Sequence, residues 1–269
     1  MSESRAGLTS DEDNVGALIE AWRAMVGRLP GHTIARSADV ATAFANASLP
    51  LMNLSILDRP TVSETDFGRA LDVARERAEA CEHGSLVVVC PSWAPPEWRR
   101  IAAGAGLVPS DSTTGMATDA LAASRRTPPL IEYRLVRDPA TATDIAVVNA
   151  RAYGMPVEMA ECISHPDVWT KDTFGVVGYV REEAVTCTAA FVIGEMIYIA
   201  LVATLPTAHG QGYAEAVMRR AIQYAQDAVG PKRIWLHATE MGRPLYRSMG
   251  FATGAELTLF AFSDGAPAH

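Results

Sequence analysis

The stretch IYIALVATLPTAHGQGYA, residues 197–214, constrains the fold more than any other part of the sequence. It opens with a β-branched and aromatic run that is typical of a largely buried strand. Pro206 marks a turn, and Gly210 and Gly212 follow it. Beyond the second glycine, apolar residues recur at helical spacing. The pattern predicts a strand, a glycine-bearing loop and a helix that ends at about Val229.

This order of elements indicates a site for an anion. The first backbone N–H groups of a helix have no intrahelical partner, the helix dipole is positive there, and glycine lets a phosphate approach the backbone. Two known kinds of phosphate loop do not match. The sequence has no G-x-x-x-x-G-K-[ST] pattern, and the Gly210–Gly212 pair is not followed by the third glycine of G-x-G-x-x-G. An ordinary tight strand-to-helix turn remains the alternative.

The loop HGQGYA, residues 209–214, resembles the pyrophosphate loop [QR]-x-x-G-x-[GA] of the GNAT superfamily of N-acetyltransferases. His209 stands where that pattern has Gln or Arg, and Pro206 lies three residues upstream, as is common in the family. A second segment, PLYRSMGF at 244–251, is similar to the LYxxxGF segment of these enzymes. It follows the loop after one helix and one strand, which is the family's order.

The resemblance implies a fold class. Strand and helix patterns over roughly 130–262 follow the GNAT order, which implies a mixed central sheet flanked by helices, in the α/β (α+β) class. The segment AASRRTPP, residues 122–129, has the composition of a linker. We therefore expect a second, smaller α/β domain over 1–125 and a GNAT acetyltransferase domain over 130–265.

The N-terminal domain has two interpretations. Its helix-then-strand order, FGRALDVARERAEACEHGSLVVVC, parallels EAVMRRAIQYAQDAVGPKRIWLHA, and EWRRIAAGAGL parallels PLYRSMGF. It is either a degenerate GNAT-like copy or a chance recurrence of helix–strand–helix units. Because it has no counterpart of the HGQGYA loop, we expect no cofactor there.

The resemblance also implies a cofactor site for acetyl-CoA. The backbone N–H groups of the loop would hold its phosphates, and the strand just before the loop would turn aside, in a bulge or splay, to face the pantetheine and the acetyl oxygen. The residues implied are Val202, Ala203, Thr204, His209, Gly210, Gln211, Gly212, Tyr213 and Ala214.

Two side chains are candidates for proton transfer. Tyr246 occupies the position of the family's tyrosine that protonates the departing thiolate, and a phenol is a suitable acid for that step. The alternative is a core tyrosine. No carboxylate lies on the strand before the loop; Glu195 is the nearest. His237 is a candidate general base by its intrinsic pKa, with a core histidine as the alternative, and Tyr198 or a water chain is a further option.

Composition limits the class of function. The chain has 269 residues, 49% hydrophobic and 20% charged, with a net charge of -8. This balance fits a folded protein and argues against nucleic-acid binding. No apolar run is long enough to span a membrane, and the polar N-terminus does not resemble a signal peptide. The four cysteines and six histidines show no metal-ligand spacing, so we expect reduced thiols, a cytoplasmic location and no metal.

The sequence therefore predicts an acetyl-CoA-dependent N-acetyltransferase. The acetyl group would pass directly to the primary amine of a small molecule, because no cysteine lies near the loop to carry it. A homodimer is compatible with this function. The alternatives are an acyl-CoA-binding regulatory protein without catalysis and a structural protein in which both halves are degenerate. The acceptor itself cannot be read from the sequence; in this fold residues 151–170 would contribute to its site.

Overall fold

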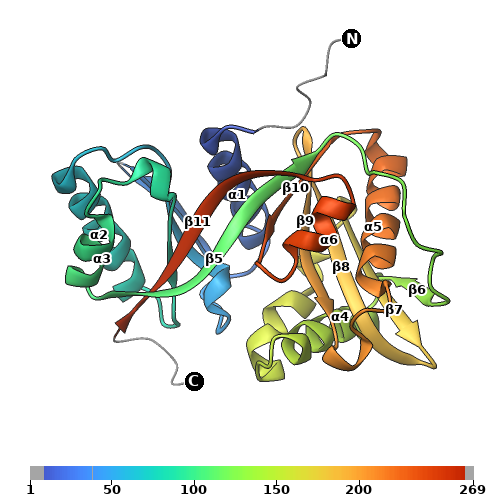
Figure 1. The fold of residues 1–269 in the computed structure, drawn as a ribbon. Helices are drawn as coiled ribbons and strands as arrows, with labels where there is room; N and C mark the ends of the chain where they lie inside the picture. The colour runs from blue at the N-terminus through green and yellow to red at the C-terminus, as the bar shows by residue number, and fades with distance from the viewer. Residues whose placement is uncertain (1–8, 38, 264–269) are drawn as a thin grey trace, which may run out of the picture. The chain divides into compact units, whose positions relative to one another are not determined.

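The computed structural model describes residues 9–37 and 39–263, and its chain folds into two compact units (Figure 1). Among the described residues, one unit contains Ala117–Leu236 and Pro244–Ala252, and the other contains residues 9–116 together with His237–Arg243 and residues 253–263. We call them the C-terminal unit and the N-terminal unit. Each unit has a mixed sheet flanked by helices, which confirms the predicted fold class. The two domain ranges expected from the sequence, 1–125 and 130–265, stay a prediction.

The C-terminal unit contains five of the strands, in the spatial order β10-β9-β8-β7-β6. β9 pairs antiparallel with β8 and parallel with β10, and β7 pairs antiparallel with β8 and with β6. Its elements are β6 (Glu132–Leu135), α4 (Pro139–Ala152), the 3-10 helices η3 (Val157–Ser164) and η4 (Pro166–Val168), β7 (Thr173–Val180), β8 (Glu183–Ile193), β9 (Met196–Thr204), η5 (Pro206–Ala208), α5 (Tyr213–Val229), β10 (Arg233–Ala238) and α6 (Arg243–Ser248).

Helices α4 and α5 cover opposite faces of this sheet. On β7 the hydroxyl of Tyr179 donates a 2.5 Å hydrogen bond to Asp144 of α4. The neighbouring Gly178 faces Val217 of α5 instead, and a Cβ there would lie 3.0 Å from that side chain. Because successive residues of a strand point to opposite faces, the sheet lies between the two helices. Figure 1 shows α5 running alongside β7 and β8.

The N-terminal unit repeats this plan. Its strands lie in the order β1-β2-β3-β4-β11-β5. β2 pairs antiparallel with both β1 and β3, and β3 pairs parallel with β4. The C-terminal unit has the same pattern: β8 pairs antiparallel with both β7 and β9, and β9 pairs parallel with β10. Its elements are α1 (Asp11–Val26), β1 (Thr33–Ser37), β2 (Val40–Phe44), η1 (Pro50–Met52), β3 (Asn53–Leu57), α2 (Glu64–Glu79), β4 (Leu86–Val89), η2 (Pro91–Trp93), α3 (Trp98–Gly104), β5 (Leu107–Thr118) and β11 (Ala252–Phe262).

The structure differs from the sequence-based expectations at several elements. β1 and β2 are not predicted, and β5 and β11 are each one long strand where the pattern allows one strand or two. The helix that the pattern predicts near 157–163 is the 3-10 helix η3. The helix predicted to be entered through Pro95 and Pro96 and closed by glycine is α3, which ends at Gly104. The first helix starts at Asp11 because Ser10 and Asp13 form a capping box. The tail expected over 1–14 is therefore helical from Asp11 onward. The remainder of the tails expected at 1–14 and 263–269 lies almost entirely outside the described residues.

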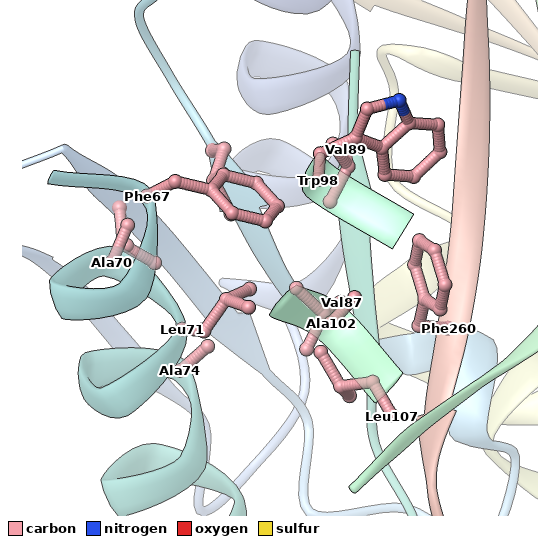
Figure 2. Close-up of a cluster of buried hydrophobic side chains, with 12 residues drawn as sticks. Phe67, Ala70, Leu71, Ala74, Val87, Val89, Trp98, Ala102, Leu107 and Phe260 are labelled. Atoms are coloured by element: carbon pink, nitrogen blue, oxygen red, sulfur yellow. The ribbon is translucent and has the colours of Figure 1, made fainter. Parts of the chain in front are cut away.

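The last strand of the chain completes the core of the N-terminal unit. β11 pairs antiparallel with β4, and Phe260 packs edge-on against Trp98 of α3 with ring centroids 5.7 Å apart. Figure 2 shows this cluster of buried side chains, to which α2, α3, β11 and the strands β2, β3, β4 and β5 contribute. Phe260 is 2% exposed. The fold of the N-terminal unit therefore depends on the C-terminal end of the sequence.

Replacing Phe260 with Ala tests this dependence. The substitution leaves a cavity between Trp98 and the sheet, and we expect the free energy of unfolding to fall by about 3–5 kcal/mol. Urea denaturation followed by circular dichroism measures the loss. Phe262→Ala is the control, because Phe262 is only partly buried and packs under Arg75; its effect should be clearly smaller. Equal losses for the two variants would contradict the assignment of Phe260 to the core.

Candidate functional site

The loop between β9 and α5 is built on two glycines in the left-handed conformation. Gly210 has φ 76° and Gly212, the N-cap residue of α5, has φ 80°. Residues with a Cβ rarely adopt this region, so the turn requires glycine at both positions. A Cβ at either glycine would meet no other atom within 4 Å, which shows that the backbone here borders open space.

The N-terminus of α5 has no side-chain cap. Its first helical hydrogen bond runs from Ala216 N to Gly212 O at 3.2 Å, so the N–H groups of Tyr213, Ala214 and Glu215 precede the intrahelical ladder. Such groups bind anions. The carboxylate of Glu215 does not oppose an anion strongly, because it is paired with Arg219 at 2.8 Å. The loop predicted from the sequence therefore has the geometry of an anion cradle.

His209 fastens the loop to the end of β9. Its Nε2 lies 2.8 Å from the carbonyl oxygen of Thr204. A carbonyl can only accept, so Nε2 carries a proton and donates it. This side chain, expected at a phosphate, is engaged with the backbone of the strand in this structure. The bond holds the turn at Pro206 closed and so fixes the position of Gly210 relative to the strand.

Strand β9 carries a bulge one residue before Val202. Leu201 has φ 55°, and the register with β8 shifts there, from Ala189 opposite Ala200 to Cys187 opposite Ala203. The pairing of β9 with β10 covers only Met196–Tyr198. Beyond Tyr198 the backbone on that side has no β10 partner. The bulge and splay that the resemblance implies near Val202, Ala203 and Thr204 are therefore present.

Side chains from other elements hold the carbonyl groups of the bulged segment. The Tyr153 hydroxyl donates to Val202 O at 3.1 Å, and the Thr186 hydroxyl donates to Ala203 O at 3.0 Å. The buried amide of Asn149 lies 3.5 Å from Leu201 O. Sequence reasoning assigned no role to these three residues in shaping the strand. The contacts join residues 17 to 52 positions apart, so no local pattern could have identified them.

Tyr246 of α6 belongs to the same compact unit as the loop. Its side chain is 8% exposed, and its ring packs edge-on against Phe251 with centroids 6.1 Å apart. Burial raises the pKa of Tyr246, and the interaction with Tyr153 raises it further. The phenol is therefore protonated at neutral pH and can act as a proton donor, not as a base.

The other candidates for proton transfer lie in different surroundings. Tyr198 is 1% exposed, and burial raises its pKa, which excludes it as a base near neutral pH. Glu195 pairs with Lys232 at 3.0 Å in the turn before β9. At about 3.3 Å per residue, the strand separates it from Val202 by roughly 20 Å at most. Trp169, within the segment 151–170 that is predicted to contribute to the acceptor site, packs against Gly175 of β7.

His237, at the end of β10, belongs to the N-terminal unit. Burial lowers the pKa of its imidazole from 6.5 to about 4, and a hydrogen bond with the backbone of Asn14 opposes the shift. The ring is neutral at pH 7. The structure therefore does not gather His237 with the loop residues in one unit, and its role as general base stays a prediction.

The pKa of His237 predicts a pH dependence of stability. Between about pH 4 and 6.5 the unfolded chain binds a proton at this side chain while the folded chain does not. The contribution of His237 to the free energy of unfolding is fully present above that range and is lost as the pH falls through it. Between pH 7 and pH 5, wild-type protein should lose about 1–2 kcal/mol more free energy of unfolding than His237→Gln. Urea denaturation at both pH values measures this difference, and equal losses would contradict it.

Residues 149–251 match the family model of the acetyltransferase (GNAT) family. This stretch is a GNAT acetyltransferase domain. It includes every predicted site residue, from the bulge of β9 and the loop to Tyr246. Among curated proteins no match is found.

Solved structures with a similar fold extend the likeness over both units. A GCN5-related N-acetyltransferase from Kribbella flavida has a TM-score of 0.67 and 14% identity, covering 92% of this chain and 95% of that one. A functionally unknown conserved protein from Staphylococcus epidermidis ATCC 12228 has a TM-score of 0.63 and 11% identity, covering 87% and 94%. A GCN5-related N-acetyltransferase from Sphaerobacter thermophilus has a TM-score of 0.58 and 15% identity, covering 86% and 79%. At these identities the likeness shows the fold alone.

The N-terminal unit lacks the features of the loop at the corresponding place. Between β3 and α2, the hydroxyl of Ser63 caps the helix by accepting from Asp66 N at 3.1 Å. Glu64 and Asp66 add negative charge to the first turn. The fully buried carboxylate of Asp58 pairs with Arg36 at 2.5 Å. The positive end of α2 is thus already capped by Ser63 and balanced by Glu64 and Asp66, and the absence of a cofactor from this unit stays a prediction.

Within 9–37 and 39–263, no group of three or more His, Cys, Asp and Glu side chains could hold a metal ion. Among the helices of this part of the chain, none is long and apolar enough to cross a membrane.

Proposed function

We propose that this protein is an acetyl-CoA-dependent N-acetyltransferase that transfers the acetyl group directly to the primary amine of a small molecule. The observation that carries the proposal is the uncapped N-terminus of α5. It lies behind two left-handed glycines and directly after a bulged strand, inside a GNAT domain. An anion cradle next to free strand backbone suits a cofactor that has phosphates at one end and a thioester at the other.

The residues of the loop fit the cofactor. The N–H groups of Gly210–Ala214 would hold its pyrophosphate, because the helix N-terminus is positive and glycine leaves room. The backbone of Val202, Ala203 and Thr204 would hold the pantetheine arm and polarise the acetyl carbonyl. Bound acetyl-CoA supplies an activated carbonyl carbon for attack by an amine. Tyr153, with its hydroxyl on Val202 O, would keep the strand in the shape that presents these donors.

Tyr246 would complete the transfer. The amine nitrogen forms a bond with the acetyl carbon, the carbon–sulfur bond breaks, and the phenol of Tyr246 gives its proton to the departing sulfur. The proton lost by the amine goes to water or to His237, which stays the predicted base. A fully buried thiol at Cys187, whose pKa is raised by burial, does not suit an acyl carrier. Transfer in a ternary complex therefore fits better than an acyl-enzyme.

The acceptor would enter beside α4 and η3. Tyr153 is 51% exposed there, and the exposed carboxylates of Glu158 and Glu161 lie on η3. Negative charge at the entrance favours a protonated amine, and the net charge of -8 acts in the same direction. A cytoplasmic location and a homodimer are compatible with this function and stay predictions.

Substituting Gly212 with Val tests the cradle. A β-branched residue at φ 80° strains the turn, and its side chain occupies the space in front of the helix N-terminus. We expect acetyl-CoA binding, measured by titration calorimetry, to fall below detection. Gly194→Val is the matched control, because Gly194 has φ 52°, open space around it and a position at the far end of β9. If the Gly212 variant is folded and binds as well as wild type, the loop assignment is wrong.

The role of Tyr246 predicts a separation of kinetic constants. Tyr246→Phe keeps the packing on Phe251 but removes the proton donor, so kcat should fall by about 100-fold or more with little change in acetyl-CoA affinity. Steady-state release of free thiol, measured with a panel of amines, gives both constants. Tyr224→Phe on α5 is the control and should leave kcat unchanged. An unaltered kcat in the Tyr246 variant would remove it from the mechanism.

An acyl-CoA-binding regulatory protein is the second candidate. It is favoured by the β9 strand, which carries no carboxylate, and by the low pKa of His237, which makes a weak base. Acetyl-CoA binding without turnover on any amine of the panel would support this candidate over the enzyme.

A further inference from the structure

The linker before β6 forms one wall of a groove along α5. The groove has a volume of about 180 Å³ and lies between linker residues including Arg126 and Thr127 and α5 residues including Ala216 and Arg220. Gly212, the N-cap residue of the helix, belongs to the same lining. The groove therefore opens directly beside the anion cradle, within the C-terminal unit.

Two arginines hold the linker on the helix. Arg219 of α5 donates to Ala122 O at 2.8 Å and also pairs with Glu215 at 2.8 Å. Arg126 of the linker donates from Nη1 to Gly210 O at 3.3 Å. The guanidinium of Arg126 therefore lies against the loop itself, at the carbonyl between His209 and Gln211.

The loop has no permanent cation of its own. Its sequence, HGQGYA, contains neither Arg nor Lys, and the Nε2 of His209 donates to Thr204 O. The chain as a whole has a net charge of -8, which repels a phosphorylated ligand. Arg126 supplies a positive charge at the place where the loop lacks one. Four of the five N–H groups of a guanidinium remain when one is used, and its planar fork matches phosphate oxygens.

We propose that the linker groove is the subsite for the nucleotide end of the cofactor, with Arg126 as the residue that binds the pyrophosphate. The inference rests on the proposed function, since it assumes that the loop binds acetyl-CoA. Arg220 lies over the ring of Tyr133, 5.0 Å from its centroid, and both residues line the groove. This stacked pair gives the groove a flat wall against which a nucleoside base can lie. The linker is thus part of the binding site.

The first experiment measures acetyl-CoA affinity by titration calorimetry. Arg126→Gln should weaken binding about 10-fold or more, since a charge-assisted bond to phosphate is lost, and Arg126→Lys should retain part of the affinity. Arg125→Gln is the matched control: it removes the same charge from the adjacent position, which does not line the groove. Equal affinity of wild type and Arg126→Gln would overturn the proposal.

A second experiment tests the groove with adenosine 3′,5′-bisphosphate as the probe. It should displace acetyl-CoA from wild type, and both Arg126→Gln and Ala216→Trp, whose indole fills the groove, should weaken that displacement about 10-fold. Displacement that is unchanged in both variants would overturn the subsite. If wild type does not bind acetyl-CoA at all, the proposed function fails. If wild type binds acetyl-CoA and the linker variants bind it equally well, the proposed function stands and the linker inference fails.

Discussion

The geometry of the site depends on the backbone of Gly212 at φ 80°. This conformation turns the chain from β9 into α5 without a side-chain cap, so the first N–H groups of the helix stay available for a ligand. The helix is stable without a cap because the face toward the sheet is buried. Five side chains from Val217 to Ala225 are buried against the sheet, and burial of this kind contributes more stability than a cap does.

The two units have similar folds but differ at the N-terminus of one helix, which is capped in α2 and uncapped in α5. They share the order helix, three strands, helix, strand, helix, and the same parallel and antiparallel pairings. This agreement supports the interpretation of the N-terminal unit as a degenerate copy. Ser63, Glu64 and Asp66 neutralise the start of α2, whereas Gly212 leaves the start of α5 open. The difference lies in a few residues at one helix end, not in the fold.

The sequence predicts local features well and long-range ones poorly. α5 ends at Val229 as predicted, because a helical period is a local signal. β1 was missed because its side chains are mostly exposed, and β2 because its alanines favour no strand by themselves. The backbone donors of the loop follow from glycine spacing. Contacts such as Tyr153 with Val202 and Arg126 with Gly210 arise only when segments 49 and 84 residues apart meet.

Chain connectivity links the proposed acid to the fold of the other unit. Tyr246 and Phe251 pack together in the C-terminal unit, and nine residues later Phe260 enters the core of the N-terminal unit. β11 fills the place between β4 and β5, so the N-terminal unit has no complete sheet without it. A unit with no cofactor loop of its own therefore anchors the segment that follows Tyr246. Loss of its fold would release that anchor, which gives the N-terminal unit a structural role.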